Sequence, residues 1–258
     1  MPLTYSGYLR LPELLSLQRP ASDEHDEILF IVIHQVYELW FKEILHEIDH
    51  LKELLAGRES ATALPTMGRI LTILKIVVAQ TDVLETMTPL DFSAFRERLE
   101  SASGSQSNQF REIEFVLGLK DGEIVGGFPE ASESRLRLTA RLAEPTVWDA
   151  LARHLDERGH DVPQEVLTRD VSGPIEPSTA MQATLVRVYR EDPAAAQLCE
   201  RLVDLDEGLQ EWRYRHVKMV ERTIGTKRGT GGSSGVHFLK STLFRPVFPD
   251  LWAIRSSL

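Results

Sequence analysis

Apolar residues recur at intervals of three and four positions along almost the whole chain, as on one face of an amphipathic helix. Alternating apolar and polar residues, which are typical of a half-buried strand, are scarce. Glycine, proline and serine concentrate in two segments, 162–178 and 225–235, which we expect to be irregular. The pattern predicts an all-α helical bundle with helices over residues 24–56, 64–88, 92–100, 107–118, 131–142, 146–158, 178–190 and 194–224.

The composition is that of a soluble globular protein, with 42% hydrophobic and 26% charged residues, and without a repeat or linker we expect one domain over residues 1–258. A net charge of -10 disfavours nucleic acid and anionic membranes as partners. The single cysteine, Cys199, excludes an intramolecular disulfide and cysteine-rich zinc sites. Because neither a leader peptide nor an apolar stretch of ~20 residues is recognisable, we expect a cytoplasmic protein without a membrane span.

The segment from His46 to His50 matches the H-E-x-x-H pattern of zinc metalloproteases, which makes such a protease a rival hypothesis. Projected on a helix, both histidines fall opposite the apolar stripe, together with Lys42 and Glu53. The stripe itself consists of Phe30, Tyr37, Phe41, Ile44, Ile48, Leu51 and Leu55. This placement favours a solvated face over a zinc site.

Two other histidines are predicted to point inward. His34 projects onto the apolar stripe beside Phe30, and His216 shares a face with Trp212, Met219, Val220 and Thr223. Arg213 and the other charged residues of that helix project mostly elsewhere. Each inward histidine is either a core residue or part of a site, and one on a long helix is a candidate axial haem ligand. Any haem would be bound noncovalently, because the chain has no C-x-x-C-H motif.

The glycine-rich segment 231–235 matches the G-x-S-x-G pattern of a hydrolase nucleophile, but no hydrophobic strand precedes it. It is also not a phosphate-binding P-loop, because Lys227 comes before the glycines. The segment is either a flexible linker or a loop that closes over a ligand, and so much glycine beside a regular helix suggests the closing loop.

Longer motifs run from TYSGYLRLPELLSLQ through FIVIHQVYELWFKEILHE, SGSQS, WRYRHVKMVERTIG and GTGGSSG to FPDLWAIRSSL. Together they resemble the tryptophan 2,3-dioxygenase family. The resemblance implies a cytoplasmic homotetramer that contains haem b, active as Fe²⁺. It also implies O₂-dependent cleavage of the C2–C3 bond of the L-tryptophan indole, giving N-formyl-L-kynurenine in the kynurenine pathway of tryptophan catabolism.

The resemblance also implies roles around the haem. The family's axial iron ligand corresponds to His216, and the histidine that bonds the indole N–H corresponds to His34. Phe30, one turn before His34, would pack against the indole. Ser103, seven positions after Arg96 on the same helical row, would lie near the haem edge with Gly104.

The remaining implied residues concern the rest of the substrate. Arg96 corresponds to the arginine that binds the substrate carboxylate, with Phe92 and Leu99 on its face, and Thr230 to the threonine that meets the ammonium. The N-terminal segment 1–20 would reach a neighbouring subunit and place Tyr5, Tyr8 and Leu9 in its pocket.

Two positions depart from the family pattern. Ser105 stands where the family usually has an aromatic residue, and His237-Phe238 replaces the usual residues after the glycine loop. We expect Ser105 to enlarge the pocket. A specialised oxygenase for a substituted tryptophan or indole, which would insert one oxygen atom, and a haem sensor without turnover remain alternatives.

Overall fold

The computed structural model describes residues 2–57, 60–231 and 234–258, and their regular structure is helical throughout, which confirms the predicted all-α class. The helices in chain order are α1 (Tyr5–Tyr8), α2 (Leu11–Leu14), α3 (Glu27–Ala56), α4 (Ser60–Leu84), α5 (Pro89–Phe95), α6 (Asn108–Leu117), α7 (Gly122–Gly126), α8 (Glu133–Ala143), α9 (Val147–Glu157), α10 (Gln164–Leu167), α11 (Thr179–Glu191), α12 (Pro193–Ile224), α13 (Val236–Ser241) and α14 (Pro249–Ala253). The chain also forms three short 3₁₀ helices: η1 (Arg96–Leu99) and η2 (Gly104–Gln106) lie between α5 and α6, and η3 (Ile254–Ser257) follows α14.

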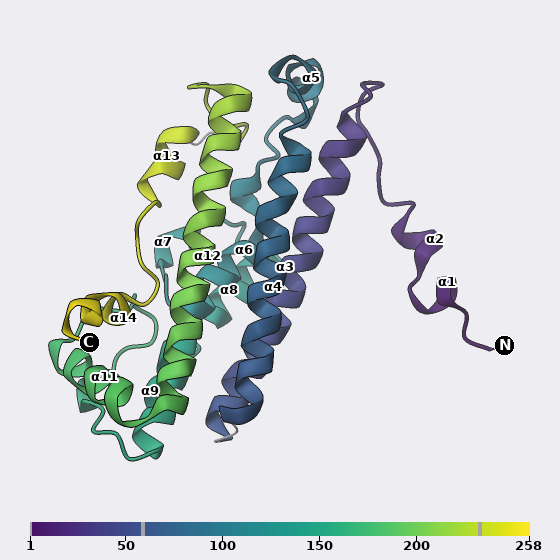
Figure 1. Cartoon of the computed structure of the whole chain (residues 1–258). Helices are drawn as coiled ribbons and strands as arrows, with labels where there is room; N and C mark the ends of the chain where they lie inside the picture. The colour runs from purple at the N-terminus through teal and green to yellow at the C-terminus, as the bar shows by residue number, and fades with distance from the viewer. Residues whose placement is uncertain (1, 58–59, 232–233) are drawn as a thin grey trace.

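Three long helices, α3, α4 and α12, run side by side and form the body of the molecule (Figure 1). The buried stripe of α3 includes Tyr37, Phe41, Ile48 and Leu51, as the helical period predicts. Leucines at three- and four-residue intervals bury the facing side of α12. Helices α6, α8 and α9 pack on the α3 side of this bundle, and α11 and α14 pack near the start of α12. The core therefore lies between long helices whose apolar faces meet.

The ends of α12 follow its sequence signals closely. The Asp192 side chain accepts a hydrogen bond from the backbone N–H of Ala195, and Pro193 occupies the first turn. Gly225, with a φ of 59°, ends the helix in a conformation that other residues adopt only with strain. The observed bounds differ by one residue from the predicted 194–224 at the start and agree at the end.

Other boundaries differ from the predictions. The predicted helix over 92–100 is wrong, because the α-helix ends at Phe95, a 3₁₀ turn follows, and Glu100 has a φ of 49° that stops the helix. The irregular segment 162–178 contains the short helix α10. The short helices α1, α2, α7, α13 and α14 were not predicted, since four to six residues carry too little periodicity.

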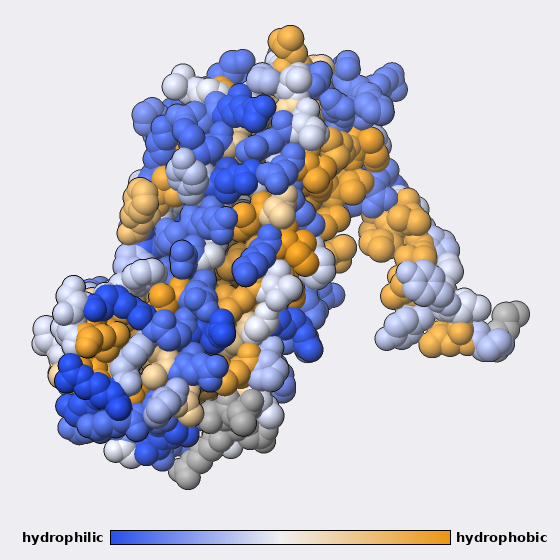
Figure 2. Space-filling model, viewed as in Figure 1, coloured by the Kyte–Doolittle hydropathy of each residue, from blue (hydrophilic) through white to orange (hydrophobic). Residues whose placement is uncertain are grey.

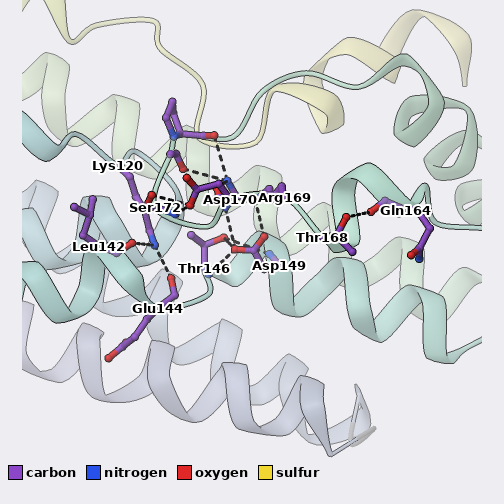
Figure 3. A network of polar contacts seen from close by, with 12 residues as sticks. Lys120, Leu142, Glu144, Thr146, Asp149, Gln164, Thr168, Arg169, Asp170 and Ser172 are labelled. Carbon is purple, nitrogen blue, oxygen red and sulfur yellow. Dashed lines mark hydrogen bonds and ion pairs between the residues drawn. The ribbon is translucent and has the colours of Figure 1, made fainter.

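A polar network joins α9 to the segment after α10 (Figure 3). Asp149 caps α9 through Thr146 and receives two hydrogen bonds from Arg169, at 2.6 and 2.9 Å. Nearby, the buried Lys120 ammonium donates to the carbonyl oxygens of Leu142 and Glu144 at the end of α8. Burial lowers the pKa of Lys120 to about 8. These contacts stabilise the lower part of the bundle, away from the site described below.

The N-terminal segment with α1 and α2 extends away from the bundle (Figure 1). Gln18 and Gln35 connect its base to α3 through a side-chain hydrogen bond of 2.5 Å. Its apolar side chains are exposed, including Leu3, Tyr5, Tyr8 and Leu15. Figure 2 shows an apolar surface on the body facing this segment, where α3 exposes Ile28, Val32 and Leu39. Within the described residues, no other part of the chain packs against either of these two apolar surfaces.

The part of α4 from Thr62 to Leu84 is long and apolar enough to cross a membrane, with a mean hydropathy of 1.5, although no such stretch was expected. It is the central helix of the bundle and packs against both α3 and α12. A core helix between two apolar faces has the same composition as a membrane span. The expectation that no stretch approaches that length is therefore corrected, and packing explains the composition.

Candidate functional site

A cavity of about 250 Å³ lies between α3, α6 and α12 and is covered by η1, η2 and the segment that includes α13. Most of the residues singled out from the sequence line it, although they come from five separate parts of the chain. They are Phe30, His34, Phe92, Arg96, Leu99, Ser103, Gly104, Ser105, His216 and Thr230. The fold therefore brings together in one cavity what the sequence separates.

His34 faces the cavity from α3 with one ring nitrogen engaged. Its Nδ1 lies 2.7 Å from the carbonyl oxygen of Phe30, so Nδ1 carries the proton and donates. The Phe30 ring lies 4.1 Å from the imidazole, centroid to centroid. Burial lowers the pKa of His34, so the ring is neutral at pH 7. Its Nε2 is left as a hydrogen-bond acceptor for a ligand in the cavity.

His216 faces the same cavity from α12. The Trp212 ring, one turn earlier, stacks on it at 5.1 Å with 7° between the ring planes. Burial and the neighbouring His34 lower the pKa of His216 to about 4, so its imidazole is neutral. A neutral, oriented imidazole is the form that binds a metal ion. The predicted inward position of both histidines is confirmed.

Arg96 is the first residue of η1, and one nitrogen of its guanidinium group already donates a hydrogen bond within the protein. Its Nη2 donates to the carbonyl oxygen of Arg228 at 2.6 Å. Its Nε is buried without a hydrogen-bond partner among the described residues. A buried donor atom without a partner is costly, which favours an acidic ligand at this position.

The segment 228–231 lies over the cavity as a strap. The Thr230 hydroxyl donates to the carbonyl oxygen of Ala102. A Cβ at Gly231 would lie 2.7 Å from the Cβ of Ser103, so this close approach requires glycine. The expectation of a covering loop agrees with this placement, while Gly232 and Ser233 lie outside the described residues.

Ser103 reaches the cavity by a route other than the one expected. It does not continue a helical row from Arg96, because the chain leaves the helix at Glu100. Instead it is the N-cap of η2, and its hydroxyl lies 3.0 Å from that of Ser105. Ser105 lines the cavity as well, whereas His237 is exposed and does not line it.

A buried ion cluster at the cavity was missed from the sequence. Glu114 pairs with Arg111 at 2.6 Å and with Arg213 at 2.7 Å, and all three side chains are nearly inaccessible to solvent. The expectation that Arg213 projects away from the core is wrong, because it reaches across to α6. A charged residue inside the apolar run IEFVLGL was the available signal for Glu114. With two guanidinium groups and one carboxylate, the cluster has a positive charge left over.

The neutral His216 and this surplus positive charge fit a metal-bearing cofactor with acidic groups. The imidazole would supply a nitrogen ligand, and His34 lines the same cavity as a hydrogen-bonding group. Arg111 and Arg213 would pair with the cofactor's acidic groups. Trp212 offers a further donor, since its buried Nε1 has no hydrogen-bond partner among the described residues.

The zinc protease hypothesis is not favoured by the structure. His46 and His50 are exposed on α3, as expected. Glu47, between them, is buried on another face and pairs with Arg69 at 2.6 Å. Among residues 2–57, 60–231 and 234–258 there is no group of three or more histidine, cysteine, aspartate and glutamate side chains arranged to hold a metal ion.

Tyr5 and Tyr8 do not line the cavity of their own chain. Both belong to α1 on the extended N-terminal segment, with 77% and 69% of their surface exposed. Their expected place in the pocket of a neighbouring subunit stays a prediction.

Comparison with known proteins covers nearly the whole chain. A family model described as tryptophan 2,3-dioxygenase matches residues 1–127 and 148–258. The chain is 59% identical over 258 residues to the tryptophan 2,3-dioxygenase of Herpetosiphon aurantiacus, covering 99% of this chain and 98% of the relative. It is 57% identical over 256 residues to that of Anaeromyxobacter sp. (strain K), covering 99% and 96%. It is 45% identical over 260 residues to that of Caulobacter vibrioides, covering 99% and 98%.

Proposed function

Because the chain belongs to the tryptophan 2,3-dioxygenase family, we propose that it opens the indole ring of L-tryptophan with O₂ by cleaving the C2–C3 bond, giving N-formyl-L-kynurenine. The observation that carries the proposal is that His34, Arg96, His216 and Thr230 meet in one cavity. The relatives' name favours ring cleavage over insertion of a single oxygen atom, a sensor role or zinc chemistry.

The cofactor in this proposal is haem b with ferrous iron. His216 would hold the iron, and Arg111 and Arg213 would pair with the propionates, in keeping with the neutral imidazole and the surplus positive charge. When bound, haem supplies the binding and activation of O₂, which amino-acid side chains cannot provide. Ser103 and Gly104 would lie at its edge.

The substrate's amino-acid group would be held by Arg96 and the strap. The unpaired Nε of Arg96 makes the guanidinium available for a carboxylate, and the Thr230 hydroxyl would turn from the Ala102 carbonyl to the substrate ammonium. The strap would close over the bound substrate and keep water out of the cavity.

The indole would lie against Phe30 and Phe92, whose rings are 5.7 Å apart, with Leu99 alongside. The free Nε2 of His34 would accept a hydrogen bond from the indole N–H and hold the ring in register. Burial lowers the pKa of His34, so its Nε2 is a weak base, and orienting the substrate is favoured over removing its proton.

A homotetramer is part of the same proposal. The extended N-terminal segment exposes Tyr5, Tyr8 and Leu9, which would complete the cavity of a neighbouring subunit. The apolar surface of α3 facing that segment needs a cover, and a second copy provides it. Deleting residues 1–12 should therefore lower activity beyond any loss of haem. A fully active truncated monomer would contradict this assembly.

We place the protein in the cytoplasm, where its free, buried Cys199 stays reduced. The acidic net charge of -10 supports small-molecule substrates, without nucleic acid or a membrane as partner.

Turnover of L-tryptophan with O₂, followed by the mass of the product, tests the proposed function. The purified protein should contain noncovalent haem, and addition of both oxygen atoms to tryptophan should be seen. His216→Ala should lose most of the haem or its five-coordinate ferrous spectrum. His46→Ala, which changes an exposed histidine of α3, should behave like the unmodified protein and serves as the matched control. An unchanged spectrum in His216→Ala overturns the ligand assignment.

A further inference from the structure

A second, smaller cavity lies in the core of the bundle, among side chains of α3, α4, α6 and α12. Its volume is about 20 Å³, and apolar atoms alone line it, with Ile44, Leu74 and Val77 among its walls. These three side chains are buried in the hydrophobic core. One water molecule needs roughly 10–15 Å³ and two to four polar partners, so this cavity has the space for a small molecule but nothing to hold water.

The core cavity and the candidate site share a wall of three aromatic rings. Phe41, Phe110 and Trp212 line both spaces. Their centroids lie 5.5 Å apart for Phe41 and Phe110, 6.2 Å for Phe41 and Trp212, and 4.5 Å for Phe110 and Trp212. A single layer of side chains therefore separates the two cavities.

The wall connects the two helices that carry the site histidines. Phe41 belongs to α3, two turns after His34, and Trp212 stacks on His216 from α12. A molecule in the core cavity would thus be separated from the candidate site by this layer of rings.

We propose that the core cavity is a binding site for dioxygen that supplies the reaction site through this aromatic wall. Dioxygen is small, uncharged and apolar, so it enters a dry apolar space at little cost, whereas water and the zwitterionic substrate do not. The cavity raises the concentration of O₂ beside the site where it is consumed. The supply role rests on the proposed function, because that function makes O₂ a substrate. Binding of an apolar gas in the core cavity is independent of the proposed function.

Filling the cavity separates its role from that of the reaction site. Val77 is almost fully buried on α4 and lines the core cavity but not the candidate site. Val77→Ile adds one methyl group, which takes up the free space while preserving the shape of a branched apolar side chain. Val78→Ile is the matched control, because Val78 is the next residue of the same helix and lines neither cavity.

The first measurement is crystallographic and independent of activity. Crystals of the purified protein are pressurised with krypton, an apolar atom close to dioxygen in size, and its anomalous signal is located. A krypton peak between α3, α4, α6 and α12 is expected in the unmodified protein and in Val78→Ile, and is expected to vanish in Val77→Ile. Absence of the peak from the unmodified protein overturns the proposal, and so does an equal peak in Val77→Ile.

The second measurement is the initial rate of tryptophan cleavage at graded O₂ concentrations. Losing an apolar site of this size should weaken O₂ binding by about the transfer free energy of one buried methylene group. Val77→Ile should therefore raise the KM for O₂ about fourfold. Its KM for tryptophan should stay that of the control. A KM for O₂ equal in both variants refutes the supply role. A krypton peak in a protein that cleaves no tryptophan contradicts the proposed function and still supports the gas site.

Discussion

Replacing Arg96 removes a cation that lines the cavity beside the strap and that we propose binds the substrate's carboxylate. In the free protein its Nη2 is bonded to the Arg228 carbonyl at 2.6 Å, while its Nε is buried and unpaired. A carboxylate would satisfy that donor with a charge-assisted hydrogen bond, worth about 1.5–3 kcal/mol. Arg96→Ala should therefore lower kcat/KM for L-tryptophan by about 10- to 150-fold.

The substrate offers its own control. Tryptamine lacks the carboxylate, so Arg96→Ala should change its turnover little, and the loss should appear only with L-tryptophan. Arg98→Ala is the matched protein control, because Arg98 lies on the same 3₁₀ turn but is exposed and lines no part of the cavity. Steady-state rates of all three proteins with both substrates form the complete test.

The outcome also distinguishes binding from loop placement. If Arg96 mainly anchors the strap through Arg228, Arg96→Ala should reduce turnover of tryptamine as strongly as that of L-tryptophan. Equal losses with the two substrates would refute carboxylate binding by Arg96. A variant that matches the parent on L-tryptophan would refute it as well.

Three further changes test other parts of the structure. His34→Ala should lower turnover by about 10- to 100-fold without abolishing it, because misplacing the indole leaves the haem chemistry intact; complete loss with haem and O₂ binding preserved would indicate a base instead. Ser105→Phe should lower the ratio of kcat/KM for methylated to plain tryptophan by about tenfold, since a ring would fill part of the cavity that Ser105 lines; an unchanged ratio would place Ser105 away from the substrate. Lys120, whose pKa falls from 10.5 to about 8 on folding, binds fewer protons folded than unfolded between these values. The free energy of unfolding should therefore rise from pH 8 to 10.5 by up to about 3 kcal/mol relative to Lys120→Met, and parallel curves from denaturant titrations would contradict the shift.

Helical periodicity in the sequence was sufficient to place single residues on the inside or outside of a helix. His34 and His216 face the cavity, and His46 and His50 are exposed, as their positions on the period predict. The same period placed the ends of α12 within one residue. These properties are local, because a helix turns by a constant angle per residue and its caps act within one turn.

The sequence pattern did not predict where single residues depart from the helical period. Glu100 leaves the helical conformation, which turned Ser103 from a helix face into the cap of a 3₁₀ turn. Arg213 was assigned to an outer face, yet it is buried because it forms an ion pair with Glu114 of α6. The sequence period measures hydrophobicity, and a long cation with a buried partner does not follow it.

Contacts between distant segments were decided by tertiary structure alone. The bond from Arg96 to Arg228 spans 132 positions, and that from Arg213 to Glu114 spans 99. The core cavity exists only because side chains of α3, α4, α6 and α12 meet without filling their common space. The sequence determines which faces of these helices are apolar. How closely those faces approach depends on the volumes and rotamers of all the packed side chains at once. This packing decides where the strap closes over the site and where a cavity stays open in the core.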